Sequence, residues 1–241
     1  MTEFEQQHLE TLQRELSRNV IVPNRENSFI PRTDDELIFT LDVQYVDEEG
    51  FVALDVMRFG GEHLGIFVSR QRATFPYIPQ FFSFREAPLL LNVIRTVMSE
   101  HGLQPALLLI DGHGLAHPRK FGIASHVGVE MNLPTIGCAK ETLIRYAGEL
   151  GELRGNTLPV VLDGEEVGRV LRTQNSKNPV FVSVGHLVEL GVACEIVLNL
   201  SSAYRISEPL RRADQAARAF ARGEERIFLG EKSLELRELS K

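Results

Sequence analysis

Three carboxylates stand where the sequence pattern predicts little contact with water. Asp42 lies within an otherwise apolar strand pattern, Glu86 at the expected first turn of a helix, and Asp111 at the end of the most hydrophobic strand. Burial of a carboxylate costs free energy unless an opposite charge neutralises it. A divalent cation with oxygen ligands does this most simply, so the three positions together indicate a metal site.

Each acid taken alone has a simpler explanation. A glutamate such as Glu86 is favourable at a helix start, and Asp111 before Gly112 is typical of a turn. For a single residue this simpler explanation is the better one, and only the conjunction of all three favours a metal. Their arrangement on a first strand, a first helix and a fourth strand resembles that of ribonuclease-H-like nucleases. Sites in open sheets also collect at the carboxyl ends of strands.

The elements that must position these acids follow a mixed strand and helix pattern. Three strands joined by short turns are expected at residues 37–43, 51–59 and 64–73, followed by a helix at 84–100. Later strands are expected at 106–110, 134–139, 159–162, 167–172 and 180–184, and later helices at 187–200 and 209–222. Continuous apolar runs such as 106–110 are typical of strands covered on both faces. We therefore predict a single α/β domain, a ribonuclease-H-like mixed sheet with helices on both faces.

The two ends of the chain differ from this domain. Residues 1–35 are predicted to form an N-terminal extension, a helix with Leu9, Leu12 and Leu16 on one face followed by a linker. Residues 36–222 form the main domain. Residues 223–241 are a charged C-terminal tail whose docking the sequence leaves open.

Composition and charge exclude several classes of protein. The chain has 241 residues, with 26 Lys and Arg against 33 Asp and Glu and a net charge of −7. An acidic chain is not a histone-like coater of nucleic acid, whose affinity depends on overall positive charge. No membrane-spanning apolar run and no signal segment are found, which predicts a soluble cytoplasmic protein with no membrane partner. Two cysteines, Cys138 and Cys194, are too few for a disulfide framework or a zinc site and are expected in the core.

Five segments resemble motifs of the endonuclease V family, the deoxyinosine 3′ endonucleases. They occur in the family's order, at residues 74–86, 110–120, 122–126, 134–140 and 181–186. They include Pro-Tyr-Ile-Pro at 76–79 and Asp-Gly-His-Gly at 111–114, and the resemblance extends from about residue 37 to about residue 216. Two segments depart from the family pattern. These are Thr40-Leu-Asp-Val-Gln-Tyr45, which keeps the Asp-x-x-aromatic spacing, and Ser207-Glu-Pro-Leu-Arg211.

The resemblance implies a hydrolase of the deoxyribonuclease V type that acts in DNA repair, with residues 36–222 as its catalytic domain. Asp42, Glu86 and Asp111 hold Mg²⁺, for which Mn²⁺ can substitute, and Asp214 is a supporting acid. Lys140 pairs with the scissile phosphate or the leaving group, and His117 contacts a phosphate or orders the waters of the metal. Water then attacks the second phosphodiester 3′ to deoxyinosine and leaves 3′-hydroxyl and 5′-phosphate ends.

The resemblance also assigns residues to recognition of the lesion. Tyr77, stiffened by a proline on each side, acts as a wedge that replaces an extruded base in the stack. Main-chain groups at glycines read the hypoxanthine, and basic side chains contact phosphate. The expected substrate-binding residues are Tyr77, Pro79, Gly112, Gly114, Gly137, Arg119 and Lys120, with His126 as a supporting core residue. Without the resemblance, Tyr77 packed under a loop and glycines in ordinary turns are the better explanations.

Several alternatives remain open at the level of the sequence. The substrate is DNA that contains deoxyinosine, or inosine-containing RNA, and the protein acts as a monomer. A broader ribonuclease-H-like structure-specific nuclease is a rival enzyme, and a lesion-binding protein without cleavage is a rival of another class. The basic residues Arg85, Arg119, Lys120 and Lys140 fall in the same motifs as the acids. They are expected to form a small positive rim around an acidic site.

Overall fold

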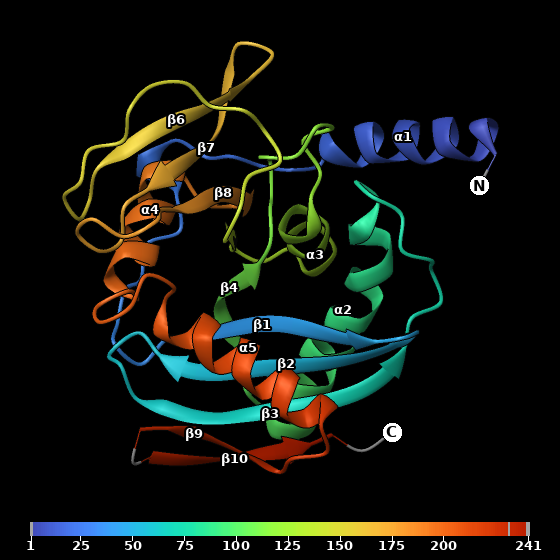
Figure 1. Ribbon diagram of the computed structural model, residues 1–241, viewed down its shortest axis with the longest axis vertical. Coiled ribbons are helices and arrows are strands. Elements are labelled where there is room, and N and C mark those ends of the chain that lie inside the picture. Colours follow the sequence, from blue (N-terminus) through green and yellow to red (C-terminus); the bar gives the residue numbers. More distant parts are fainter. Residues whose placement is uncertain (1, 231, 240–241) are drawn as a thin grey trace.

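One mixed sheet runs through the protein and carries helices on both faces (Figure 1). The computed structural model describes residues 2–230 and 232–239, so the outermost residues of the predicted extension and tail lie outside the described part. The strands are β1 (Leu37–Val46), β2 (Glu49–Arg58), β3 (His63–Arg72), β4 (Pro105–Asp111), β5 (Thr135–Ala139), β6 (Thr157–Leu162), β7 (Glu165–Leu171), β8 (Val180–His186), β9 (Arg226–Leu229) and β10 (Lys232–Glu238). The helices are α1 (Glu3–Ser17), α2 (Phe82–His101), α3 (Ile123–Met131), α4 (Leu190–Asn199) and α5 (Glu208–Ala221).

The order of the strands is β6-β7-β8-β5-β4-β1-β2-β3-β10-β9. The predicted meander of three strands is confirmed, because β1 pairs with β2 and β2 with β3 in antiparallel fashion. Strand β4 then lies parallel to both β1 and β5 at the centre of the sheet. Strands β1, β4 and β5 therefore run in the same direction and end at the same edge of the sheet.

The two faces of the sheet are covered by different helices, as predicted. Side chains alternate across β1, so Phe39 and Leu41 pack in the core under α2 and α3, whereas Ile38 packs in the core under α4. Helix α5 covers the second face beside β1, β2 and β3. Both cysteines are buried and free, as expected. Within the two described ranges, no helix is long and apolar enough to cross a membrane.

Helix α2 begins earlier than predicted, at Phe82. Glu86 therefore lies in the second turn of the helix and not in its first turn, which corrects the expectation that it favours the helix start. The reason is local, because residues 78–81 form a turn closed by a 3.0 Å hydrogen bond from the Phe81 amide to the Ile78 carbonyl, and the helix follows directly. At the other end, Gly102 adopts a φ of 65°, the left-handed conformation expected of a C-terminal cap.

The charged C-terminal segment forms two further strands at the edge of the sheet. Strand β10 pairs with β3 in parallel fashion and with β9 in antiparallel fashion (Figure 1). Ile227 and Leu236 are buried against α5 and β3. The sequence left this docking open because the apolar residues of the segment are few and alternate with charges, as is common in an edge strand.

Helix α5 is fixed to the sheet by a buried ion pair. The Arg212 guanidinium donates two hydrogen bonds, of 2.7 and 2.8 Å, to the carboxylate of Asp55 in β2, whose side chain is fully buried. A bidentate pair fixes direction as well as distance. Because Arg212 stands two residues before Asp214, this pair also sets where Asp214 lies on the sheet.

Replacement of Arg212 by Met should lower the free energy of unfolding by about 3 kcal/mol, because the fully buried Asp55 carboxylate then keeps only the His63 imidazole, 2.9 Å away, as a partner. Equilibrium denaturation with urea measures this loss. The matched control is Arg222→Met, which removes an exposed pair with Glu224 and should leave stability almost unchanged. Equal losses in the two variants would contradict the anchoring role of the buried pair.

Candidate active site

Strand alternation brings three of the expected catalytic side chains to one face at the end of the sheet. In the parallel register Leu41 pairs with Ile110, so Asp42 stands beside Asp111, and Asp111 pairs with Cys138, two residues before Lys140. Asp42 and Asp111 lie on the face covered by α4 and α5, and Lys140 follows β5 on that same face. Three neighbouring strands thus present Asp42, Asp111 and Lys140 to one another.

Helix α5 adds a fourth side chain from above this face. Ligand oxygens of Asp42, Asp111 and Asp214 all lie within 4.8 Å of one another. Lys140 Nζ lies 2.7 Å from Asp111 Oδ2 and 2.9 Å from Asp214 Oδ1. Arg218, one turn along α5, lies 3.1 Å from the same Asp214 oxygen. The cluster therefore combines three acids with two cations.

Burial and mutual repulsion change the protonation of these acids. Burial raises the pKa of Asp42 to about 8, and the charges of Asp111 and Asp214 act in the same direction. Burial also raises the pKa of Asp111. Burial acts in this direction on Asp214 too, but the hydrogen bonds and charges of Lys140 and Arg218 outweigh it and lower the pKa of this carboxyl. The positive charge of Lys140 does not fully offset the negative charge of the acids, so the cluster favours binding of an additional cation.

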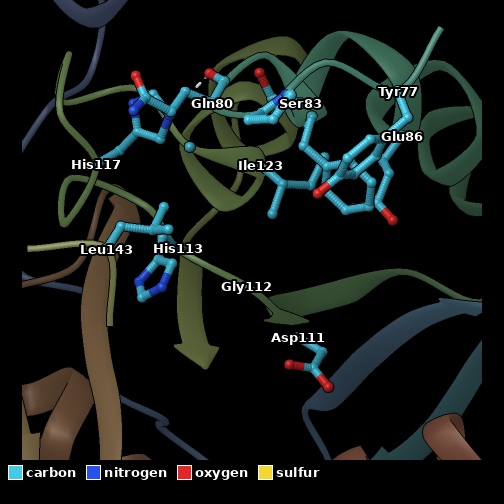
Figure 2. A pocket seen from close by; sticks show the side chains of 13 residues that line it. Tyr77, Gln80, Ser83, Glu86, Asp111, Gly112, His113, His117, Ile123 and Leu143 are labelled. Carbon is cyan, nitrogen blue, oxygen red and sulfur yellow. Dashed lines mark hydrogen bonds between the residues drawn. The ribbon is translucent and has the colours of Figure 1, made fainter. Parts of the chain in front are cut away.

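Glu86 approaches from the opposite side of the sheet, on α2. It does not belong to the cluster of oxygens within 4.8 Å, which contains Asp214 in its place. The ligand set of Asp42, Glu86 and Asp111 that the resemblance implies therefore stays a prediction. Glu86 still lines the same cavity as Asp111 (Figure 2), and burial raises its pKa well above the usual value, with the charges of Asp42 and Asp111 adding to this effect. It is thus an electrostatic neighbour of the cluster.

The oxygen donors of the cluster are of the kind that binds a divalent ion. Asp42, Asp111 and Asp214 offer carboxylate oxygens, the ligands preferred by Mg²⁺ and Mn²⁺. Burial raises the pKa of Asp42 and of Asp111, and a cation bound between them would stabilise their ionised forms. The residues present therefore fit a hard divalent cation.

A cavity of about 450 Å³ opens beside the cluster, within the range of small-ligand pockets. Its walls come from the loop before α2, the first turns of α2, the loop after β4, the start of α3 and the loop after β5 (Figure 2). The lining residues are Tyr77, Pro79, Gln80, Phe82, Ser83, Glu86, Asp111, Gly112, His113, His117, Gly122, Ile123 and Leu143. An acid of the cluster and the tip of the 76–79 segment thus share one cavity.

The expected wedge residue is exposed at this cavity. Tyr77 is 68% exposed, and its ring meets that of Phe82 edge to face at 5.7 Å. This exposure differs from the simpler explanation, in which Tyr77 packs under a loop. Three residues later, Gln80 adopts a φ of 69°. A residue other than glycine in this region costs about 1–2 kcal/mol, so the turn needs support from its surroundings.

The three glycines expected to approach the base differ in their surroundings. Gly112 lines the cavity and has a φ of 150°, and a Cβ there would collide with Ile123. A Cβ at Gly114 would collide with the carbonyl of Val184 in β8, and one at Gly137 with the loop backbone at Gly112. The latter two glycines therefore allow the loop after β4 to pack closely on β5 and β8. Gly112 is the one that borders the cavity.

The basic residues do not form the expected positive rim. Arg85 is buried and donates to the carbonyls of Phe75 and Asp47. Arg119 is only 8% exposed, and Lys120 pairs with Glu165 at 2.7 Å. Lys140 is the one of the four that meets the acidic cluster. The rim is absent among the described residues because the two arginines are used to hold the protein's own loops.

The two expected histidines also have structural partners. His117 Nε2 lies 3.0 Å from the Gln80 carbonyl (Figure 2), and burial together with Arg119 lowers the pKa of His117 to about 4. His126 packs against the rings of Phe84 and Phe121, consistent with a supporting core position. Neither histidine belongs to the cluster of acids.

Sequence reasoning missed several residues of the site. Gln80, Ser83 and Leu143 line the cavity, and Gln13 of α1 lies behind its wall. Gln80 and Ser83 stand within the 74–86 motif, so their spacing from Tyr77 was an available signal. Gln13 and Leu143 carry no such signal, because only the folded chain brings them to this place.

Comparison with known proteins agrees with this geometry. The profile of the endonuclease V family matches residues 15–215. The endonuclease V of Streptomyces coelicolor is 43% identical over 185 residues, which cover 76% of this chain and 78% of that protein. The structure of the endonuclease V of Streptomyces avermitilis has a TM-score of 0.80 at 36% identity, over 92% of this chain and 94% of that one.

A further structure shares the fold. The endonuclease V of Ciona intestinalis, solved in complex with a 24mer DNA containing an inosine followed by a ribo-adenosine, has a TM-score of 0.79 at 23% identity. The match covers 92% of this chain and 99% of that one. With most of its length matched by the family profile and by a relative at 43% identity, the chain belongs to the endonuclease V family and is a nuclease, which is a hydrolase.

Proposed function

We propose that the protein is a Mg²⁺-dependent repair endonuclease that recognises deoxyinosine in DNA and hydrolyses the second phosphodiester 3′ to the lesion. The observation that carries this proposal is the cluster of Asp42, Asp111 and Asp214 beside a cavity of about 450 Å³. The cluster suits hydrolysis of a phosphodiester, and the cavity suits an extruded base. The complex of the Ciona intestinalis relative with inosine-containing DNA supports this substrate.

The acids have distinct roles in this proposal. Asp42 and Asp111 are the residues that would hold a divalent ion, with Asp214 and Glu86 as the further carboxylates from the two faces of the sheet. Such an ion, when bound, lowers the pKa of water and neutralises the negative charge that develops on the leaving oxygen. Glu86, whose pKa burial raises well above the usual value, exchanges a proton with water in the cavity. Lys140 presents its ammonium group to the phosphate from the same edge of the sheet.

Recognition of the lesion is the role of the cavity walls. Tyr77 stacks in place of the extruded base, since its exposed ring stands on a segment stiffened by two prolines. Main-chain groups near Gly112 face the cavity and distinguish the hydrogen-bonding pattern of hypoxanthine from that of adenine. Lys140 contacts the phosphates, and Lys120 and Arg119 are further candidates that the resemblance names.

A labelled duplex with one deoxyinosine tests the function directly. We expect a single nick at the second phosphodiester 3′ to the lesion when Mg²⁺ or Mn²⁺ is present, loss of nicking in EDTA, and recovery when Mg²⁺ is added back. Sequencing gels alongside undamaged, uracil-containing and flap duplexes and an inosine-containing RNA map the preference. Faster cleavage of the RNA would assign the endoribonuclease, equal cleavage of undamaged flaps a structure-specific nuclease, and binding without cleavage a lesion-binding protein.

Replacement of Asp42 or Asp111 by Ala should reduce nicking about a thousandfold or more, because the site loses a ligand of the ion that stabilises the transition state. Single-turnover assays at saturating Mg²⁺ measure the rate, and circular dichroism checks the fold. The matched control is Asp163→Asn, at an exposed turn where φ is already 53°. Full Mg²⁺-dependent activity in either alanine variant would remove the metal assignment.

Replacement of Tyr77 by Ala should weaken binding of inosine-containing DNA about tenfold, since one aromatic stacking contact contributes about 1–3 kcal/mol. Fluorescence anisotropy with Ca²⁺ in place of Mg²⁺ measures the affinity for inosine-containing and undamaged duplexes. The control is Tyr77→Phe, which keeps the ring and should keep the preference. An unchanged preference for inosine in the alanine variant would rule out the wedge.

A further inference from the structure

Helix α1 contacts the rest of the fold through a buried polar residue, Gln13. Gln13 is the fully buried residue of this helix, whereas Leu9, Leu12 and Leu16 on its apolar face are only half-buried. A buried amide must find hydrogen-bond partners, because an unsatisfied one costs its full desolvation. The partners of Gln13 all belong to segments that border the cavity, which connects the N-terminal helix with the wall of the site.

Three donors converge on one backbone carbonyl, that of Gln80. Gln13 Nε2 donates at 3.1 Å, Arg119 Nη2 at 2.9 Å, and His117 Nε2 lies at 3.0 Å (Figure 2). His117 Nδ1 accepts a bond from the Arg119 amide, so Nε2 carries the ring proton and also donates. A carbonyl offers two lone pairs, and here three donors from two distant segments, α1 and the loop at 117–119, surround it.

The side chains of this group also bind one another. Arg119 Nε donates to Gln13 Oε1, and Arg119 Nη1 donates to Gln80 Oε1 at 3.0 Å. The guanidinium lies over the ring of Phe81, 4.5 Å from its centroid. The amide of Gln13 therefore acts in two ways: its nitrogen donates to Gln80, and its oxygen orients the arginine that also binds Gln80.

The carbonyl they hold belongs to a strained turn. Residues 78–81 are closed by the hydrogen bond from the Phe81 amide to the Ile78 carbonyl, with Pro79 in the second position and Gln80, at a φ of 69°, in the third. This is the pattern of a type II turn, in which glycine is preferred at the third position. A glutamine there persists only when its surroundings hold it. Tyr77 immediately precedes this turn.

We propose that Gln13 is a positioning residue for the segment 76–81: together with Arg119 and His117 it holds the Gln80 carbonyl and so fixes the turn that presents Tyr77 at the cavity. Its importance for the substrate rests on the role proposed above for Tyr77. The N-terminal helix is, on this view, part of the lesion-recognition apparatus, although it contributes no group to the cavity itself.

The test uses the full chain with Gln13→Met, which keeps the length of the side chain and removes its donor and acceptor. The matched control is Gln7→Met, the same change at an exposed position of the same helix. Amide hydrogen exchange of Phe81 reports opening of the turn, and exchange in β4 reports the intact sheet. We expect exchange at Phe81 to rise about tenfold in Gln13→Met alone, with β4 unchanged.

Kinetics with inosine-containing DNA give the functional readout. We expect KM to rise about tenfold and kcat to change less than about twofold, because the acids are untouched and only the wedge is misplaced. Adding Gln80→Gly to Gln13→Met should restore most of the protection at Phe81, since glycine removes the strain that the hydrogen bonds oppose. A glutamate in place of Gln13 serves as the second variant: it keeps the acceptor for Arg119, loses the donor, and should open the turn as Gln13→Met does.

The outcomes separate this proposal from the proposed function. Exchange at Phe81 that rises no more than in Gln7→Met would overturn the positioning role and leave the nuclease assignment intact. A rise in exchange and in KM together supports it. A rise in exchange with unchanged KM would support the hold on the turn and contradict the role given to Tyr77. A fall in kcat with unchanged KM would overturn the proposal, because the effect would then lie at the acids.

Discussion

Repulsion among buried carboxylates is the constraint on which the rest of this structure depends. Asp42 and Asp111 are neighbours on parallel strands, and Asp214 faces them from α5, so the fold brings together charges that separate in an unfolded chain. Part of the cost is offset by Lys140 and by Arg218 on α5. The pKa of Asp42 is nevertheless raised, first by burial and then by the charges of Asp111 and Asp214. Such a cluster can persist only on rigid supports, and the central parallel strands, whose hydrogen bonds and burial fix each side chain, provide them.

The same constraint explains why α5 is held so firmly. A helix lying on a sheet through alanines alone can slide, because apolar contact has little directional preference. Helix α5 does present a stripe of small residues to the sheet, including Ala213, Ala216 and Ala217. The bidentate pair between Arg212 and the buried Asp55 depends on angle, so it fixes the position of the helix along the sheet. Asp214 thereby reaches the strand ends on a helix that directional bonds tie to the sheet.

Much of this could be predicted from the sequence, and the limits have physical reasons. The alternation of side chains along β1 and the apolar run of β4 were enough to place Asp42 and Asp111, since strand periodicity is a local property. The close approach of Asp214, rather than Glu86, to Asp42 and Asp111 was not predictable, because it depends on which face of the sheet each helix covers. The burial of Arg119 was missed for a similar reason: its partner Gln13 stands 106 positions earlier in the chain. Strands β9 and β10 were missed because their short alternating pattern is also that of a solvated tail.

The acids stand on rigid strands, whereas the residue proposed to recognise the lesion stands on an exposed loop. This difference explains why α1 contacts that loop through a polar side chain, Gln13. Hydrolysis needs acids at fixed separations, which strands supply, whereas a wedge must stand on an exposed loop to enter a duplex. An exposed loop has few apolar contacts, and its two prolines restrict its backbone without fixing its direction. Directional bonds on a single carbonyl can fix it, since hydrogen bonds depend on angle and apolar contacts do not. A glutamine in α1, an arginine and a histidine meet at Gln80 in this way, so a loop that must remain exposed is oriented from its buried side.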